Sequence, residues 1–155
     1  MDKVTNPFYH YQDLWKSENF KKWESGQTEE FRKYRKLWQE CPKCQKAPSF
    51  PLSINIEITD VCNARVFCTM CPKHFLKPKN AFMPFDTVRK ILDEARAGGA
   101  YAVNLNGAGE PSTHPQIVEI VKYAKNIGFL DIMFHTNGTL LNEAKARALI
   151  DAGIT

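Results

Sequence analysis

The chain has 155 residues, of which 43% are hydrophobic and 25% are charged. This length and composition predict a folded protein with a buried core, and they exclude the collagen-like, low-complexity and disordered classes. The formal net charge is +4, from 21 lysines and arginines against 17 aspartates and glutamates. That excess is small and spread along the chain, so it gives no support for a nucleic-acid partner.

No stretch reaches the roughly 18 to 20 apolar residues of a membrane-spanning helix, and the first residues lack the apolar core of a signal peptide. We therefore expect no membrane association and a cytoplasmic location. The five cysteines all lie between Cys41 and Cys71, and an odd number cannot all pair with one another. Reducing compartments disfavour disulfides in any case, so these cysteines favour metal or redox chemistry.

Residues 1–51 differ from the rest, because all three tryptophans lie there among lysines and glutamates. After an acidic start at residues 28–30, which suits the positive end of a helix dipole, apolar residues recur at helical spacing. They are Phe31, Tyr34, Leu37 and Trp38. This stripe either packs within the protein or binds a partner. Pro42 and Pro48 break the pattern, so we interpret residues 1–51 as a helical N-terminal extension and linker.

Three β-rich segments follow, at residues 53–59, 101–106 and 129–135. The first alternates apolar and polar residues, with many β-branched side chains, and this pattern predicts a strand. A strand-to-helix turn is expected at the glycine-rich residues 107–111.

An amphipathic helix is predicted after each of these strands. Asp86 and Asn142 are the expected N-caps of the first and third helices, and Gly98-Gly99, Gly128 and Gly153 are the expected stops. The expected buried faces are Val88, Ile91, Leu92 and Ala95, then Ile117, Val118, Val121 and Ala124, then Ala148, Leu149 and Ala152. Three strand–helix units in succession predict an α/β fold with a parallel sheet and right-handed crossovers. The last two residues resemble the start of a fourth strand, so we expect the chain to be cut short.

Cys62, Cys68 and Cys71 follow the first predicted strand with the spacing C-x5-C-x2-C. Three thiolates without a fourth suit a [4Fe-4S] cluster that leaves one iron open to another ligand. A second interpretation uses two CxxC pairs, Cys41 with Cys44 and Cys68 with Cys71, as a four-cysteine structural zinc site. The cysteine spacing alone leaves both the iron–sulfur and the zinc interpretation open, and it slightly favours zinc.

Residues 56–63 (IEITDVCN) and 68–72 (CTMCP) resemble the cluster loop of the radical S-adenosylmethionine (radical SAM) enzymes. The resemblance continues at residues 106–111 (NGAGEP) and 135–141 (HTNGTLL), which are similar to the segments that end that family's second and third strands. The spacing departs from the family's usual C-x3-C-x2-C, because Val66 and Phe67 lengthen the first interval. Met70 also stands where an aromatic residue is common.

The resemblance implies a partial TIM-type barrel, of which residues 52–155 would supply about three of six strand–helix units. It implies that Cys62, Cys68 and Cys71 ligate the cluster, and that S-adenosylmethionine (SAM) binds at five further positions. These are Gly109, Glu110, Pro111, Thr136 and Asn137. In the family, an electron passed to SAM cleaves a carbon–sulfur bond and yields a 5′-deoxyadenosyl radical. The glycine-rich turn and the Asn137-Gly138 dipeptide could also be ordinary turns.

An electron donor such as flavodoxin or ferredoxin is the implied protein partner, and the substrate is unknown. The four histidines are predicted to be surface or packing residues. Three functions are therefore weighed: a radical SAM enzyme or its N-terminal part, a small zinc-stapled α/β binding module, and an inactive remnant whose motifs survive without a complete barrel.

Overall fold

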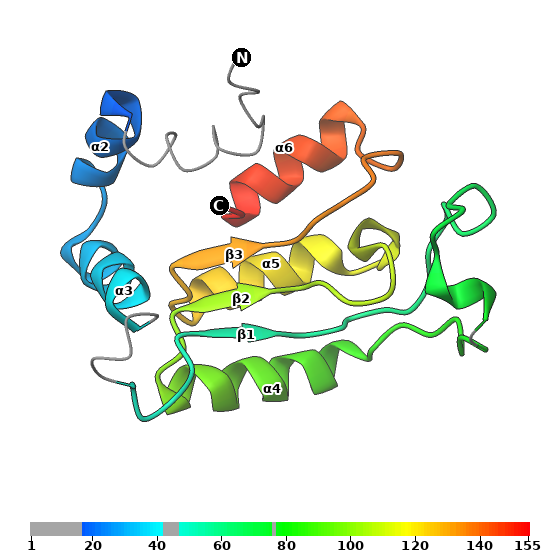
Figure 1. The fold of residues 1–155 in the computed structure, drawn as a ribbon, viewed down its shortest axis with the longest axis horizontal. Helices are drawn as coiled ribbons and strands as arrows, with labels where there is room; N and C mark the ends of the chain where they lie inside the picture. The colour runs from blue at the N-terminus through cyan, green and yellow to red at the C-terminus, as the bar shows by residue number, and fades with distance from the viewer. Residues whose placement is uncertain (1–16, 42–46, 76) are drawn as a thin grey trace, which may run out of the picture. The chain divides into compact units, whose positions relative to one another are not determined.

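The computed structural model describes residues 17–41, 47–75 and 77–155 (Figure 1). The chain divides into two compact units, residues 1–47 and residues 48–155. Among the described helices, none is long and apolar enough to cross a membrane.

The first unit contains helices α2 (Glu18–Ser25) and α3 (Glu29–Glu40). Each begins at a hydroxyl side chain, because the Ser17 and Thr28 oxygens accept hydrogen bonds from the backbone three residues further on. Neighbouring aromatic rings then connect the two helices, with Trp23 edge-on to Phe31 at 5.5 Å between centroids. Phe31 and Tyr34 are buried, whereas Trp38 is 45% exposed. The predicted stripe is thus mainly a packing face within this unit. Cys44 lies outside the described residues.

The second unit is built on a three-stranded parallel sheet of β1 (Ser53–Asn55), β2 (Ala102–Asn104) and β3 (Asp131–Met133), in the order β1-β2-β3. The register aligns Ile54, Val103 and Ile132 across the sheet. This confirms the predicted α/β fold with parallel strands. The strands are shorter than predicted, although single hydrogen bonds extend the pairing beyond their ends, as from Ile56 N to Asn104 O at 2.9 Å.

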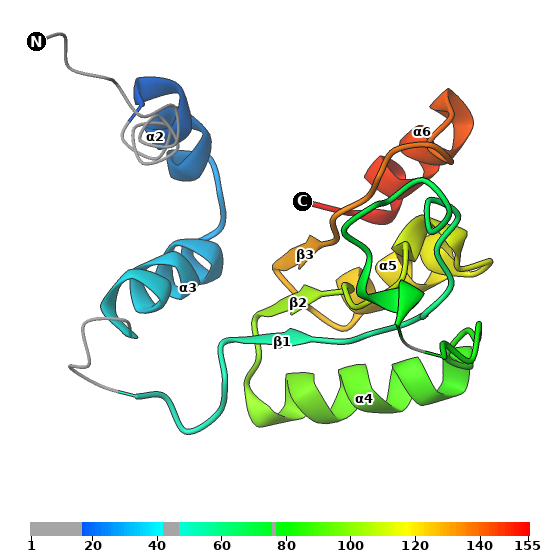
Figure 2. The same ribbon diagram turned by 45° about the vertical axis from the view of Figure 1, so that its right-hand side comes forward.

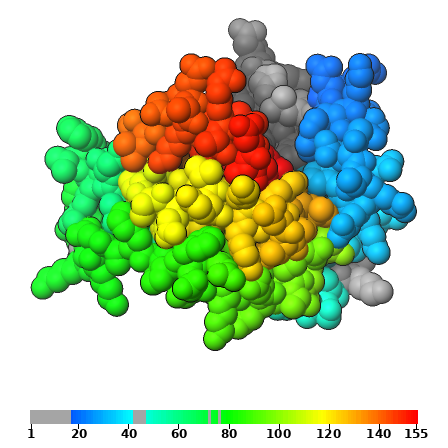
Figure 3. Space-filling model, turned by 180° about the vertical axis from the view of Figure 1, so that it is seen from behind, coloured from blue at the N-terminus to red at the C-terminus, as the bar shows by residue number. Residues whose placement is uncertain are grey.

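Three helices alternate with these strands: α4 (Phe85–Gly98), α5 (Ile117–Asn126) and α6 (Glu143–Ala152). Viewed from behind, they lie side by side on one face of the unit (Figure 3). The Asn142 side chain accepts from Lys145 N at 2.8 Å, so the predicted cap of α6 is confirmed. The predicted cap at Asp86 is wrong, because the N-cap of α4 is Pro84, two residues earlier, and the Pro84 carbonyl accepts from the first turn. The stop falls at Gly99 in the left-handed conformation, with φ of 108°.

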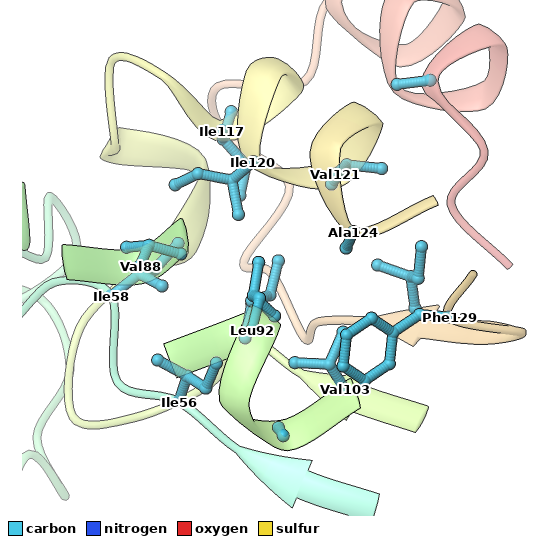
Figure 4. Close-up of a cluster of buried hydrophobic side chains, with 14 of the residues drawn as sticks. Ile56, Ile58, Val88, Leu92, Val103, Ile117, Ile120, Val121, Ala124 and Phe129 are labelled. Carbon is cyan, nitrogen blue, oxygen red and sulfur yellow. The ribbon is translucent and has the colours of Figure 1, made fainter. Parts of the chain in front are cut away.

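The hydrophobic core lies between the sheet and these helices (Figure 4). Most of the predicted helix faces are buried, and Ile91, Val118 and Ala148 are partly buried. Side chains alternate along a strand, so Val103 and Ile132 point into this core while their neighbours point to the opposite face of the sheet. That opposite face carries Asn55, Asn104 and Met133, which are aligned in register.

After α6 the chain returns to the edge of β3. The backbone N–H of Thr155 donates to Ile132 O at 3.0 Å, and its hydroxyl accepts from Ile132 N at 2.9 Å. The edge of β3 that faces away from β2 is therefore bonded to Thr155 at Ile132.

Candidate functional site

Three loops meet at the carboxyl ends of the strands, on the right-hand side of Figure 1. They are the cysteine loop after β1 (residues 59–71), the glycine-rich loop after β2 (residues 107–113) and the loop after β3 (residues 134–141). Parallel strands end at one edge of a sheet, and this edge is where open α/β sheets and barrels present their sites. Figure 2 shows the three loops at the same end from a second direction.

Glu110 ties the loop after β2 to the loop after β3. Its side chain is only 4% exposed. One carboxylate oxygen accepts from Ser112 N at 3.0 Å, Ser112 Oγ at 2.6 Å and Thr136 Oγ1 at 2.7 Å. The other accepts from Asn137 N at 2.7 Å. Four donors match the four or so acceptor sites of a carboxylate. The chain's own donors therefore occupy this group.

The ionisation of Glu110 follows from the same contacts. Burial is the largest influence and would raise its pKa, but the hydrogen bonds from Asn137, Ser112 and Thr136 together outweigh it and lower the pKa. The carboxylate is therefore ionised at neutral pH. We read its role as holding Thr136 and Asn137 in place beside the loop after β2.

Gly109 allows that loop to approach the end of β1 closely. A Cβ atom at this position would lie 2.1 Å from the carbonyl oxygen of Thr59 and 2.8 Å from that of Val61. The neighbouring Glu110 N–H donates to Val61 O at 2.7 Å. The glycine is thus required by the backbone next to Cys62.

Glu57 makes a second contact to the glycine-rich loop that the sequence did not reveal. Its carboxylate accepts from Ala108 N at 2.7 Å, and a Cβ at Gly107 would lie 2.3 Å from its Cγ. The available signal was its position, because Glu57 alternates with the buried Ile56 and Ile58 in the predicted strand.

The cysteine loop carries Cys62, Cys68 and Cys71 as free thiols, with Cys68 exposed and the other two half-buried. Within the described parts of the chain, no three His, Cys, Asp or Glu side chains stand together as a ready metal site. The role of Cys62, Cys68 and Cys71 as cluster ligands therefore stays a prediction. The two extra residues of the long interval, Val66 and Phe67, are 82% and 84% exposed. The insertion is thus accommodated in solvent, away from the core.

Lys73 closes the base of the cysteine loop. Its side chain is 2% exposed, and its ammonium donates to the backbone carbonyl of Asp60. Arg65, from within the loop, donates to Lys73 O at 3.1 Å. The two ends of the loop, before Cys62 and after Cys71, are therefore joined to each other.

Asp60 organises the return of the chain toward α4. Its carboxylate accepts from the backbone of Lys79, Asn80 and Ala81 at 2.7, 3.2 and 2.6 Å. The bond from Ala81 is the largest influence on its pKa, which is lowered. Asn80 takes a left-handed backbone conformation with φ of 53°, which asparagine tolerates well. This turn lets residue 82 pair with Thr59.

A triangle of polar side chains joins the cysteine loop to the loop after β3. Asn137 Nδ2 donates to Asn63 Oδ1 at 2.9 Å, and Asn63 Nδ2 donates to Thr139 Oγ1 at 2.6 Å. Thr139 Oγ1 in turn donates to Asn137 Oδ1 at 2.8 Å. Sequence reasoning assigned no role to Asn63 or Thr139, although both lie in the segments that carry the family resemblance.

Two histidines of this region, His135 and His114, are held by hydrogen bonds at the ends of the second and third loops. The side-chain oxygen Oδ1 of Asn106 accepts a hydrogen bond from the backbone N–H of His135 at 2.7 Å. The NH₂ group of Asn106 therefore faces Nδ1 of the His135 ring. Nδ1 is then an acceptor, and Nε2 carries the proton of the neutral ring. His114 is buried between the Met83 carbonyl and the N–H of Gln116, at 3.0 and 3.1 Å, and it is a packing residue.

The comparisons with known proteins agree with this arrangement. Residues 56–155 match the Radical SAM superfamily, so the chain belongs to that superfamily. Two similar proteins are the tungsten-containing aldehyde ferredoxin oxidoreductase cofactor-modifying protein of Pyrococcus furiosus and a probable GTP 3′,8-cyclase of Methanothermobacter thermautotrophicus. They are 35% identical over 100 residues and 37% identical over 103 residues, covering 64% and 66% of this chain. The chain spans only 27% and 32% of their lengths.

The crystal structure of BtrN in complex with AdoMet and 2-DOIA has the same fold over 70% of this chain and 44% of BtrN. The TM-score is 0.61 and the sequence identity is 19%. The predicted partial barrel and the predicted family are thereby confirmed, and the zinc-stapled binding module is not supported. Members of the superfamily bind a [4Fe-4S] cluster and SAM, which are the predicted cofactors. The donor set fits them, because three free thiols lie on one loop beside the glycine-rich turn.

Proposed function

We propose that residues 52–155 form the N-terminal part of a radical SAM core, preceded by the extension and linker of residues 1–51. The whole protein would be an enzyme that reductively cleaves SAM and acts on a substrate whose identity is unknown. The observation that carries this proposal is the junction of three loops at the carboxyl ends of β1, β2 and β3. Glu110 and Asn63 join these loops through the chain's own side chains.

Cys62, Cys68 and Cys71 are the proposed ligands of the cluster. Thiolates suit iron–sulfur clusters because sulfur is a soft, anionic ligand. When bound, the cluster supplies the electron that breaks the carbon–sulfur bond of SAM and yields the 5′-deoxyadenosyl radical. The loop that carries the three thiols is anchored at both ends, by Lys73 at its base and by Asn63 beside Cys62. It can therefore rearrange around a ligand without losing its place above the sheet.

Gly109, Glu110, Pro111, Thr136 and Asn137 are the proposed SAM-binding positions. Their side chains are occupied or small: the Glu110 carboxylate and Thr136 hydroxyl bond to each other, and the Asn137 amide bonds to Asn63. We therefore propose that this region binds the methionyl part of SAM chiefly through backbone groups. Glu110 acts as a positioning residue that fixes where those groups stand.

The proposed location is cytoplasmic, and the proposed electron donor is a protein such as flavodoxin or ferredoxin. The four described cysteines are all free thiols, as is usual in a reducing compartment. A cluster with an open iron also needs a source of single electrons, which these carriers provide.

The test is anaerobic reconstitution of the chain with iron and sulfide. We expect about four iron and four sulfide per chain, with the broad visible absorption of a thiolate-bound cluster. Alanine at Cys62, Cys68 or Cys71 should each abolish binding. Cys41→Ala is the matched control and should retain it. Iron content unaffected by all three substitutions would refute the ligand assignment.

SAM binding is tested separately on the reduced cluster. Addition of SAM should change the electron paramagnetic resonance spectrum, because SAM would occupy the open iron. An unchanged spectrum at saturating SAM would refute the SAM site while leaving the cluster assignment intact.

A further inference from the structure

The most exposed large apolar side chains of the described residues gather in one short segment, residues 66–75. Val66, Phe67, Met70 and Phe75 are 82%, 84%, 89% and 92% exposed, more than any other large apolar side chain that the structure describes. The segment lies in and just after the cysteine loop, at the right-hand end of Figure 1. Single exposed apolar residues are normal on a protein surface, but a gathering of them marks an interaction site.

The loop holds these side chains outward through its own hydrogen bonds. The backbone N–H groups of Phe67 and Cys68 both donate to Ala64 O, at 3.0 and 2.9 Å. The His74 ring then donates from Nε2 to Cys68 O at 2.9 Å. Residue 75 therefore follows directly on a contact to the cysteine loop, and the exposed apolar side chains belong to bonded turns.

The same part of the chain is positively charged. Between residues 61 and 85 there is no aspartate or glutamate, and the cationic residues are Arg65, Lys73, Lys77 and Lys79. Asp60, just before this range, interacts electrostatically with the buried Lys73 and offsets its charge. Arg65 donates to Lys73 O at 3.1 Å, and the backbone of residues 79–81 donates to the Asp60 carboxylate. Three further cations, two of them fully exposed, therefore border the apolar side chains.

We propose that the four apolar side chains, together with Arg65, Lys77 and Lys79, form the docking surface for an acidic one-electron carrier protein. We call this set of residues the carrier patch. Opposite charges steer a transient partner and fix its orientation, while aromatic side chains supply contact area. Electron-transfer partners use small interfaces, and a patch on one loop matches that size.

This inference rests on the proposed function, because the carrier patch is joined to the proposed cluster ligands along the chain. Phe67 directly precedes Cys68, and Met70 directly precedes Cys71. A carrier bound here lies next to the loop that would hold the cluster. The carrier gives up one electron and the cluster takes it up, so one is oxidised as the other is reduced. The two residues that lengthen the first cysteine interval, Val66 and Phe67, thereby gain a role.

Four substitutions at exposed positions test the carrier patch without removing a buried side chain. Phe67→Ser and Phe75→Ser remove apolar contact area, and Lys77→Glu and Lys79→Glu reverse a charge. Two matched controls lie on helices of the same unit. Ile150→Ser changes an apolar side chain that is 67% exposed on α6, and Lys122→Glu reverses an exposed charge on α5.

The first measurement is the binding of an oxidised acidic flavodoxin, by isothermal titration calorimetry, to the reconstituted chain and to the cluster-free chain. We expect each of the four substitutions to raise the dissociation constant by about tenfold or more, and the controls by less than about twofold. Higher ionic strength should weaken wild-type binding, and the two lysine variants should show a smaller salt dependence.

The second measurement is the rate at which flavodoxin hydroquinone reduces the reconstituted cluster, followed by stopped-flow absorbance. The rate at low flavodoxin concentration should fall by about tenfold in the four patch variants. Iron content and the rate of reduction by dithionite should equal those of wild type, because a small reductant needs no docking surface.

Two other occupants fit an apolar, cationic patch, and the same variants distinguish them. Binding to phosphatidylglycerol vesicles that the four substitutions abolish, with flavodoxin binding unchanged, would overturn the proposal in favour of a lipid surface. Self-association in sedimentation velocity that they abolish, again with flavodoxin binding unchanged, would overturn it in favour of a second copy of the chain.

Absence of flavodoxin binding by the wild-type chain, or equal binding by wild type and all four variants, would also overturn this proposal. The proposed function would then still stand, because cluster formation does not depend on the carrier patch. Failure of the wild-type chain to form any cluster would overturn both.

Discussion

Replacing Glu110 by glutamine is the sharpest test of how the candidate site is held together. The change keeps the shape of the side chain and removes its charge. One carboxylate oxygen accepts three hydrogen bonds and the other accepts one, from Asn137 N. The amide oxygen of a glutamine would take the place with three donors, so its NH₂ group would face the Asn137 N–H. One hydrogen bond is lost outright, and the other three become bonds to a neutral acceptor.

The expected cost follows from those four contacts. A hydrogen bond to a charged group contributes about 1.5 to 3 kcal/mol net, and bonds between neutral groups are roughly half as strong. Because the bonds share one acceptor group, they are not additive. We expect Glu110→Gln to lower the free energy of unfolding by about 2 to 4 kcal/mol at pH 7. Glu94→Gln is the control, because Glu94 is exposed in the middle of α4 and should change stability by less than about 0.5 kcal/mol.

The pH dependence of this difference identifies the charge as its source. The pKa of Glu110 is lower in the folded protein than its ordinary value of 4.5. Its contribution is therefore complete above about pH 5 and is lost as the pH falls through the folded pKa. Urea unfolding of wild type and Glu110→Gln should give a difference that is constant near neutrality and shrinks below pH 4.5. A difference that stays the same down to pH 3.5, or a variant as stable as Glu94→Gln, would refute this account of Glu110.

Three further substitutions test other contacts. Gly109→Ala should cost about 1 to 3 kcal/mol or more in urea unfolding, because its Cβ would lie 2.1 Å from Thr59 O; wild-type stability would contradict that geometry. Leu92→Ala should cost about 2 to 5 kcal/mol, since this side chain is fully buried, and a smaller loss would indicate that the core collapses around it. Nitrogen chemical shifts should show the neutral His135 ring protonated at Nε2, and Asn106→Asp should move that proton to Nδ1; an unchanged tautomer would exclude the Asn106 contact.

The sequence predicted the fold well because its patterns are local and repeated. Alternation in residues 53–59 and helical spacing in residues 117–124 report which face is buried, and burial is what fixes the register of a parallel sheet. The cap at Asn142 was predicted correctly because this pattern is local too: its hydrogen-bond partner lies three residues further on. The N-cap of α4 was wrongly predicted at Asp86, because Pro84, with its fixed backbone angle and free carbonyl, begins the helix instead.

The contacts within the candidate site could not be predicted in this way. Glu110 reaches Thr136 across 26 residues, and Asn63 reaches Thr139 across 76. No periodicity encodes such pairs, because they depend on which loops the sheet brings to one edge. The glycine-rich loop shows the consequence: residues 107–111 were predicted as a turn, but no local pattern indicated that Gly109 lies against the backbone of Thr59.

These connections suggest why one edge of a small sheet can hold a site that binds two cofactors in order. Glu110 fixes the loops after β2 and β3 against each other through a buried carboxylate, so the chain's own contacts hold the backbone of the proposed SAM-binding region. The cysteine loop is tied to neighbouring segments at its base and beside Cys62, and the side chains of its middle, from Val66 to Met70, are exposed. These ties keep the three cysteines next to the neighbouring loops that would bind SAM.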